Sequence, residues 1–216
     1  MKKIFLLTFL CLSLIFIANA SIMINPAGHA RDPGRRLIEG VERAQTFKFA
    51  EKLQQELQKK YGIKVILTRY PGEEIAEWEP ASFANRLGID FYLSIHLYKE
   101  DLLKPKIFLY QLIYNPMVDL YFKSFDPYKF LPVTQSHFRN INKTTSYGKF
   151  IKDTLTLEPY KNRFDFYGLY GLPLKPICGV VAPALLLEVG IHRDEQWQSL
   201  IDPLVESLGF LGQDKT

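Results

Sequence analysis

Short apolar runs alternate with segments of helical periodicity along most of this chain of 216 residues. The apolar runs are typical of strands, and apolar residues three and four positions apart between them are typical of amphipathic helices. Residues 183–189 are almost continuously apolar, as in a strand buried on both faces. The alternation predicts an α/β fold in one domain, with helices on both faces of a sheet. The expected strands are 21–25, 63–68, 90–96, 106–114, 166–172 and 183–189, and the expected helices are 41–61, 80–87, 145–157 and 194–208.

The first 20 residues have the pattern of a secretory signal peptide. Lys2 and Lys3 give a positive start, residues 4–17 are almost entirely apolar, and the triplet ANA at 18–20 is a small-residue cleavage site. An uncleaved anchor is the alternative, but the run is shorter than the roughly 20 residues that span a bilayer. We expect an exported protein, periplasmic or extracellular, whose domain covers 21–216 without stable membrane insertion.

The net charge does not indicate a nucleic-acid partner, and the cysteine content excludes an internal disulfide. Loss of Lys2 and Lys3 lowers the formal net charge from +4 to +2, which is too weak to indicate a nucleic-acid partner. Only Cys178 remains after signal removal, so no internal disulfide is expected. Its apolar surroundings favour a buried packing role over a nucleophilic one.

Residues 115–142 are rich in Tyr, Phe and Pro and show no clean period. We expect an aromatic-rich insertion or cover over one edge of the domain. The aromatic residues between 108 and 130 have two interpretations: a groove for sugar rings or peptide, or packing of the insertion onto the sheet. Packing is the favoured one.

Four residues with metal-binding or proton-accepting side chains accompany the expected strands. His29 lies in the loop after the first strand, Glu42 begins the following helix, His96 ends the third strand, and Glu188 lies in the last apolar run. Ligands of open α/β sheets bind outside the carboxyl ends of the strands, so the four side chains are expected in one crevice. Two histidines and a glutamate are the minimum set for a catalytic zinc with one open position. A second glutamate is then available as a base.

Each of these residues has a structural interpretation when taken alone. His29 fits an exposed loop residue, and His96 fits a packed core histidine. Glu42 fits a residue that complements the helix dipole, with Glu39 as a nearby rival. Glu188 differs, because a carboxylate inside an apolar run is costly to bury without a partner. That cost favours either a functional role or a buried ion pair.

Five segments occur in a specific order: INPAGHARDPG (24–34), ERAQTFKFAEKL (42–53), ILTR (66–69), FANRLGIDFYLSIH (83–96) and APALLLEVG (182–190). Together they resemble the zinc-dependent N-acetylmuramoyl-L-alanine amidases of the amidase-3 type, which cleave peptidoglycan. Members of that family usually read IxxDPGHGGxDPG, a glutamate opening a helix, LTR, SIHAN and PAxLxExGF. The first motif is divergent here, because Gly28 takes the histidine's place in an ungapped alignment and His29 follows it.

The resemblance implies a twisted mixed sheet of about six strands flanked by helices. It implies Zn²⁺ held by His29, Glu42 and His96, with Glu188 as the catalytic base. The implied reaction is hydrolysis of the amide bond between N-acetylmuramic acid and L-alanine, with the glycan-peptide of peptidoglycan as substrate and a regulatory protein partner as an open option. One alternative is a catalytically inactive, amidase-like wall-binding or regulatory protein. Another is a zinc peptidase or amidase that acts on a different peptide substrate.

Overall fold

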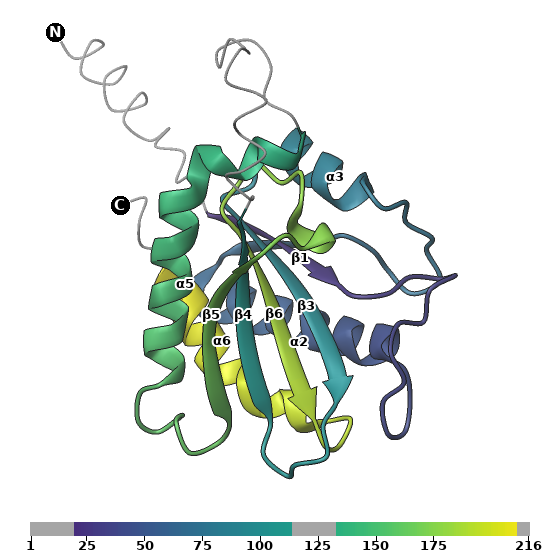
Figure 1. Ribbon diagram of the computed structural model, residues 1–216, viewed down its shortest axis with the longest axis vertical. Coiled ribbons are helices and arrows are strands. Elements are labelled where there is room, and N and C mark those ends of the chain that lie inside the picture. The colour runs from purple at the N-terminus through teal and green to yellow at the C-terminus, as the bar shows by residue number, and fades with distance from the viewer. Residues whose placement is uncertain (1–19, 114–132, 211–216) are drawn as a thin grey trace, which may run out of the picture.

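The computed structural model describes residues 20–113 and 133–210 (Figure 1). The signal peptide expected over 1–20 therefore lies, except for Ala20, outside the described residues. Only 133–142 of the expected insertion is described, and it forms the 3₁₀ helix η1 (Val133–Asn140) and the first residues of a helix. Within the described part of the chain, no helix has the length and apolar character that crossing a bilayer requires.

Six strands form one mixed sheet in the order β2-β1-β3-β6-β4-β5 (Figure 1). The strands are β1 (Ser21–Pro26), β2 (Lys64–Leu67), β3 (Phe91–Lys99), β4 (Lys106–Leu112), β5 (Asp165–Leu172) and β6 (Ala184–Ile191). β1 pairs in parallel with β2 and β3, and β3 pairs in parallel with β6. β4 is antiparallel to β6 and parallel to β5. The predicted mixed α/β sheet is thereby confirmed.

Helices cover the two faces of the sheet unequally. The helices are α2 (Glu42–Tyr61), α3 (Glu79–Leu87), α5 (Ile141–Leu155) and α6 (Ile201–Gly209), with 3₁₀ helices η2 (Lys175–Ile177) and η3 (Gln196–Leu200). α2, α5 and α6 pack on one face around the larger hydrophobic core, and in Figure 1 α2 and α6 lie behind the sheet. α3 and η2 cover part of the other face with a smaller core.

The smaller core leaves room for polar side chains on the same face. Tyr92 and Leu186 belong to that core. Side chains alternate between faces along a strand, so His96 on β3 and Glu188 on β6 continue this face beyond it. His96 and Glu188 therefore lie on the less covered side of the sheet.

The prediction that His96 ends its strand is wrong. β3 continues to Lys99 and β6 to Ile191, and the two strands stay paired through that last pair of residues. Backbone hydrogen bonding does not depend on whether a side chain is polar, so a histidine or glutamate need not end a strand. His96 and Glu188 project from within the sheet.

The prediction of one closing helix over 194–208 is also wrong. A short 3₁₀ helix comes first, and the α-helix begins only at Ile201. Pro203 cannot lie in a helix interior, because it lacks an N–H group and its ring clashes with the preceding turn, but the first turn tolerates it. Asp194 lies outside both helices and is buried, where its carboxylate accepts the backbone N–H of Ile38.

The inward face of α2 differs from the expected one near its start. Apolar spacing predicts Ala44 and Phe47 inside. Ala44 is exposed, and Phe47 packs against the larger core but is only half-buried. Gln45, Thr46 and Phe49 are the fully buried residues of these turns. Gln45 accepts the indole N–H of Trp197, which satisfies both buried polar groups. The first turns of α2 are therefore held by polar contacts that periodicity of apolar residues does not register.

Candidate functional site

Arg69, the last residue of the ILTR segment, joins the end of β1 to the start of α2. Its buried guanidinium donates to the backbone oxygens of Pro26 (3.2 Å), Ala27 (2.8 Å) and Arg43 (3.0 Å). Burial, helped by the charge of Arg43, lowers the pKa of Arg69 to about 10, so the group stays charged at neutral pH. These bonds hold the backbone of Pro26 and Ala27, in the INPAGHARDPG segment, against the first turn of α2.

His29 lies in a turn closed by reciprocal backbone hydrogen bonds with Asp32, of 2.8 and 3.2 Å. The carbonyl oxygen of His29 also accepts Nη1 of Arg43 at 2.8 Å, and its ring Nδ1 faces the N–H of Arg31 at 3.4 Å. Gly28 has a φ of 76°, and a Cβ there would lie 2.8 Å from the Cβ of Arg43. Glycine is therefore required where this loop meets α2. The backbone of His29 is fixed, and only its half-buried ring can change orientation.

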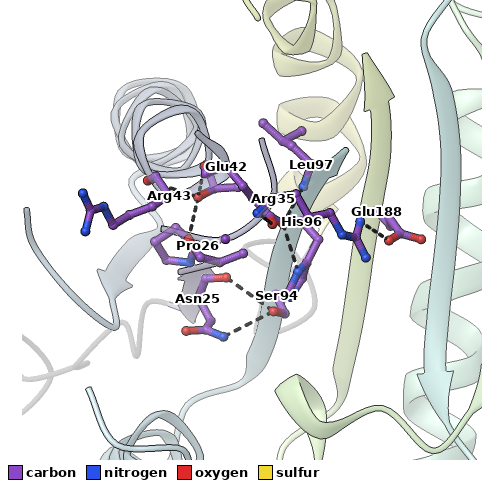
Figure 2. Close-up of polar contacts among 12 residues, drawn as sticks. Asn25, Pro26, Arg35, Glu42, Arg43, Ser94, His96, Leu97 and Glu188 are labelled. Carbon is purple, nitrogen blue, oxygen red and sulfur yellow. Dashed lines mark hydrogen bonds and ion pairs between the residues drawn. The ribbon is translucent and has the colours of Figure 1, made fainter. Parts of the chain in front are cut away.

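Glu42 begins α2 and is almost fully buried. Its Oε1 lies 3.2 Å from Nδ1 of His96 and accepts the N–H of Leu97 at 3.0 Å (Figure 2). Its Oε2 accepts the backbone N–H of Arg35 at 2.9 Å. A Cβ at Gly34 would lie 2.8 Å from Oε2, so glycine lets the loop close over this carboxylate.

The hydrogen bonds to Glu42 decide its charge state. Burial by itself raises the pKa of a carboxyl group. The bonds from His96, Arg35 and Leu97 outweigh burial and hold the pKa of Glu42 below its ordinary value. The group is therefore an ionised carboxylate beside a histidine, brought together from residues 54 positions apart in the chain.

Glu188 lies beside His96, because the two are register partners on adjacent parallel strands. Its Oε1 accepts Nη1 of Arg35 at 2.6 Å, and its Oε2 accepts the hydroxyl of Tyr110 at 3.1 Å. Figure 2 shows the Arg35 side chain pointing from the first-motif loop towards Glu188. Burial, together with the charge of Glu188, raises the pKa of Tyr110 to about 12, so its hydroxyl stays protonated and donates.

Arg35 connects the two carboxylates. Its backbone binds Glu42, its side chain binds Glu188, and its guanidinium carbon lies 5.9 Å from the ring centre of Tyr98. Burial lowers the pKa of Arg35, but the hydrogen bond and charge of Glu188 outweigh this and leave it raised. The candidate site is therefore a continuous polar strip of Glu42, His96, Arg35 and Glu188.

His29 is not part of this strip. Within residues 20–113 and 133–210, no three His, Cys, Asp or Glu side chains are grouped closely enough to hold one metal ion. His29 and His96 do line the same cavity, of about 280 Å³, together with Arg69, Lys175 and Cys178. Burial raises the pKa of the Cys178 thiol, in keeping with a packing role.

The Glu42 and His96 pair suits a zinc ion. Zinc bonds of about 2.0–2.2 Å at tetrahedral angles put two ligand atoms about 3.3 Å apart, and Oε1 of Glu42 lies 3.2 Å from Nδ1 of His96. Nε2 of His96 is buried and has no hydrogen-bond partner among the described residues. The spacing of Glu42 and His96 matches that of two ligands of one metal ion, whereas His29 is not grouped with them.

The other two described histidines lie elsewhere. His192 follows β6, with its Nδ1 at 3.3 Å from the carbonyl oxygen of Glu100, and His137 is buried in η1. Sequence reasoning missed Arg35 and Tyr110. The cost of burying Glu188 was a signal that a partner exists, but it did not identify the cation or the hydroxyl.

Comparisons with known proteins identify a related family and a shared fold. Residues 22–107 match the family model described as N-acetylmuramoyl-L-alanine amidase, and the resemblance to this family is thereby confirmed. No curated protein sequence matches the chain significantly.

Solved amidase structures share the fold. The amidase of Clostridium difficile 630 is 17% identical with a TM-score of 0.64, over 88% of this chain and 95% of that one. The catalytic domain of CwlV from Bacillus (Paenibacillus) polymyxa var. colistinus is 14% identical with a TM-score of 0.62, over 88% and 96%. CwlD of Clostridioides difficile, solved in complex with the GerS lipoprotein, is 13% identical with a TM-score of 0.61, over 89% and 98%.

Proposed function

Proceeding from the N-acetylmuramoyl-L-alanine amidase match over residues 22–107, we propose that this protein hydrolyses the amide bond between N-acetylmuramic acid and L-alanine in peptidoglycan. The observation that carries the proposal is the Glu42 and His96 pair, with Glu188 as the register neighbour of His96. An ionised carboxylate, an imidazole and a second carboxylate in one polar strip are the groups that metal-assisted amide hydrolysis requires.

The proposed metal is Zn²⁺, held by Glu42 and His96 and, once its ring turns towards them, by His29. When bound, zinc polarises a carbonyl group and makes water more acidic. The backbone N–H groups of Leu97 and Arg35 hold the Glu42 carboxylate in place for this role. Fixing a ligand by neighbouring hydrogen bonds is what a precise metal site needs.

Glu188 is the proposed base. It takes a proton from the attacking water and passes it to the leaving amine of L-alanine. Arg35 and Tyr110 each occupy one of its oxygens. Because a carboxylate oxygen has two lone pairs, each oxygen still has one free to accept a proton. The two contacts orient the carboxylate and leave one lone pair on each oxygen for the proton.

The test combines metal content with product analysis. Protein covering 21–216 is expected to bind one zinc ion and to release stem peptides with free L-alanine amino groups from purified peptidoglycan. Glu188→Ala should keep the metal and lose the release, whereas His29→Ala should weaken zinc binding. Zinc-loaded protein that releases no stem peptide would overturn the proposal. Substrate stripped of N-acetylmuramic acid separates this activity from that of a peptidase, which would still cleave it.

A catalytically inactive, wall-binding amidase relative is the second candidate. Two observations favour it: His29 is not grouped with Glu42 and His96, and Glu188 is bound by the guanidinium of Arg35. Such a protein would be purified without zinc, would bind peptidoglycan, and would behave identically when Glu188 is replaced by alanine.

Export and regulation complete the proposal. Residues 1–20 would serve as a signal peptide and 21–216 as the catalytic domain, because the substrate lies outside the cytoplasm. A regulatory protein partner is supported by CwlD, a similar amidase whose structure contains the GerS lipoprotein. Comparing the size of the exported protein with that of the full chain tests the cleavage.

A further inference from the structure

Four aromatic rings form a continuous surface beside the candidate site. Phe108 and Tyr110 belong to β4, and Tyr167 and Tyr170 belong to β5. The ring of Phe108 stacks on Tyr167 with centroids 4.8 Å apart, and Tyr110 lies 6.0 Å from Tyr170. Phe108 also lies 6.3 Å from both Tyr110 and Tyr170. We call these four residues the aromatic platform.

An irregularity in β5 puts two of the rings on the same face. Residues three apart in a regular strand point to opposite faces. The register between β4 and β5 shifts after Ile107, so that Phe108 faces Gly168 and Tyr167 is an extra residue. On one face, Tyr167 stacks on Phe108 and Tyr170 lies tilted beside it. Phe166 and Leu169 pack against the larger core on the other face. The bulge therefore builds the platform without removing residues from the core.

Gly168 and one hydrogen bond fix the position of the outer ring. Gly168 has a φ of 144°, and a Cβ there would lie 3.2 Å from the ring of Tyr170. The hydroxyl of Tyr170 donates to the backbone oxygen of Tyr167 at 2.8 Å. The rings are held relative to one another before any ligand binds, which lowers the entropy cost of binding.

The platform is exposed and continuous with the proposed base. Tyr167 is 47% and Tyr170 43% exposed, while Phe108 and Tyr110 are half-buried. Tyr110 donates to Glu188, and Phe108 is the register partner of Glu188 across β4 and β6. If the amide of a bound substrate lies at Glu188, a group attached to that amide would therefore contact Tyr110 before the other platform residues.

The two sides of the candidate site differ in chemistry. On the β1 side of His96 lies the cavity lined by charged residues, among them Arg69, Lys175 and Glu77. On the β4 and β5 side lie aromatic rings with phenolic hydroxyls. A ligand with a sugar arm and a peptide arm joined by an amide matches this division, because sugar rings present apolar C–H faces edged by hydroxyl groups.

We propose that the aromatic platform binds pyranose rings of the peptidoglycan glycan strand. The proposal rests on the proposed amidase function for the choice of glycan. The C–H faces of the N-acetylated sugars pack on Tyr167 and Tyr170, and the lactyl arm leads from the platform to Glu188. Tyr167 and Tyr170 are specificity-determining residues for the glycan side of the substrate.

The experiment measures binding of peptide-free glycan strands of alternating N-acetylglucosamine and N-acetylmuramic acid by titration calorimetry. Tyr167→Ala and Tyr170→Ala should each weaken binding about tenfold, the effect of losing one stacked ring. Tyr167→Phe keeps the ring and should bind like the unaltered protein. Phe150→Ala is the matched control, because Phe150 is also 43% exposed but lies on α5, which packs on the opposite face of the sheet.

Two further measurements keep the test decisive. In the unaltered protein, backbone amide resonances of residues 165–172 should shift on addition of the glycan, which requires no variant to fold. Free stem peptide should leave those resonances unchanged. Unchanged glycan affinity in both alanine variants, or equal loss in Phe150→Ala, overturns the platform proposal. If glycan binding depends on the two tyrosines but the protein releases no stem peptide, the platform proposal is supported and only the amidase proposal is contradicted.

Discussion

Glu42 and Glu188 flank the same histidine but are held by different kinds of group. The Glu42 side chain is 4% exposed and is bound by two backbone N–H groups as well as by His96. The Glu188 side chain is 19% exposed and is bound by the side chains of Arg35 and Tyr110. Backbone donors cannot move without disrupting the strand or loop that carries them, whereas side-chain donors can rotate away. The first arrangement suits a ligand that must stay in place, and the second suits a group that exchanges protons.

The largest expected effect is that of Glu188→Gln on turnover. Glutamine keeps the size and can still accept hydrogen bonds, but it cannot take a proton. Peptidoglycan hydrolysis should fall about 100-fold to 10,000-fold, the range for loss of a general base. Zinc content and thermal stability should stay close to those of the unaltered protein. Turnover within a factor of two would remove Glu188 from the reaction.

Glu42→Ala should have the largest effect on stability. It leaves the buried N–H group of Leu97 and the partly buried N–H group of Arg35 without their acceptor, at a cost of about 2–4 kcal/mol in the free energy of unfolding. Urea denaturation of metal-free protein measures this cost. Glu39→Ala is the control, because Glu39 is exposed and should change stability by less than about 0.5 kcal/mol. Equal losses in the two variants would contradict the backbone-held description of Glu42.

Arg35→Met should change stability much less. The Arg35 side chain is half exposed, and pairs of this kind contribute about 1 kcal/mol or less. The backbone N–H of residue 35 remains available to Glu42 in the variant. Urea denaturation measures the free energy of unfolding. A loss above about 2 kcal/mol would mean that Arg35 stabilises Glu188 as strongly as the backbone N–H groups stabilise Glu42.

Acid should reveal the difference between Glu42 and an ordinary carboxyl group in metal-free protein. The pKa of Glu42 is lower in the folded state than its ordinary value of 4.5, so the folded state holds fewer protons than the unfolded state around that pH. Its contribution to stability is complete above the ordinary pKa and is lost as pH falls through the lowered one. The Glu42→Gln variant should therefore lose less stability than the unaltered protein as pH falls from about 5 to about 3. The same change of unfolding free energy with pH in both proteins would contradict the pKa shift.

Most of the fold was predictable because its strands and helices have strong local signals. The apolar run of β6, the stop at Gly62 after α2 and the periodicity of the second half of α2 all depend on residues close together in sequence. The buried face of the first turns of α2 could not be predicted from apolar spacing, because Gln45 on that face is polar and its partner, Trp197, lies 152 residues away. The split of the last helix follows from Pro203, a local signal that the periodicity had outweighed.

The sequence alone determined the chemical types available to the site and the elements that carry them. It placed a glutamate in a central strand, a histidine on its neighbour and a glutamate at the start of a helix. Only the tertiary structure decided their partners: His96 for Glu42, Arg35 and Tyr110 for Glu188, and a cavity rather than the polar strip for His29. The physical reason is that burial creates a demand for a hydrogen bond or a counter-charge. Which group meets that demand depends on strand register and loop path, and neither is encoded by the spacing of residues along the chain.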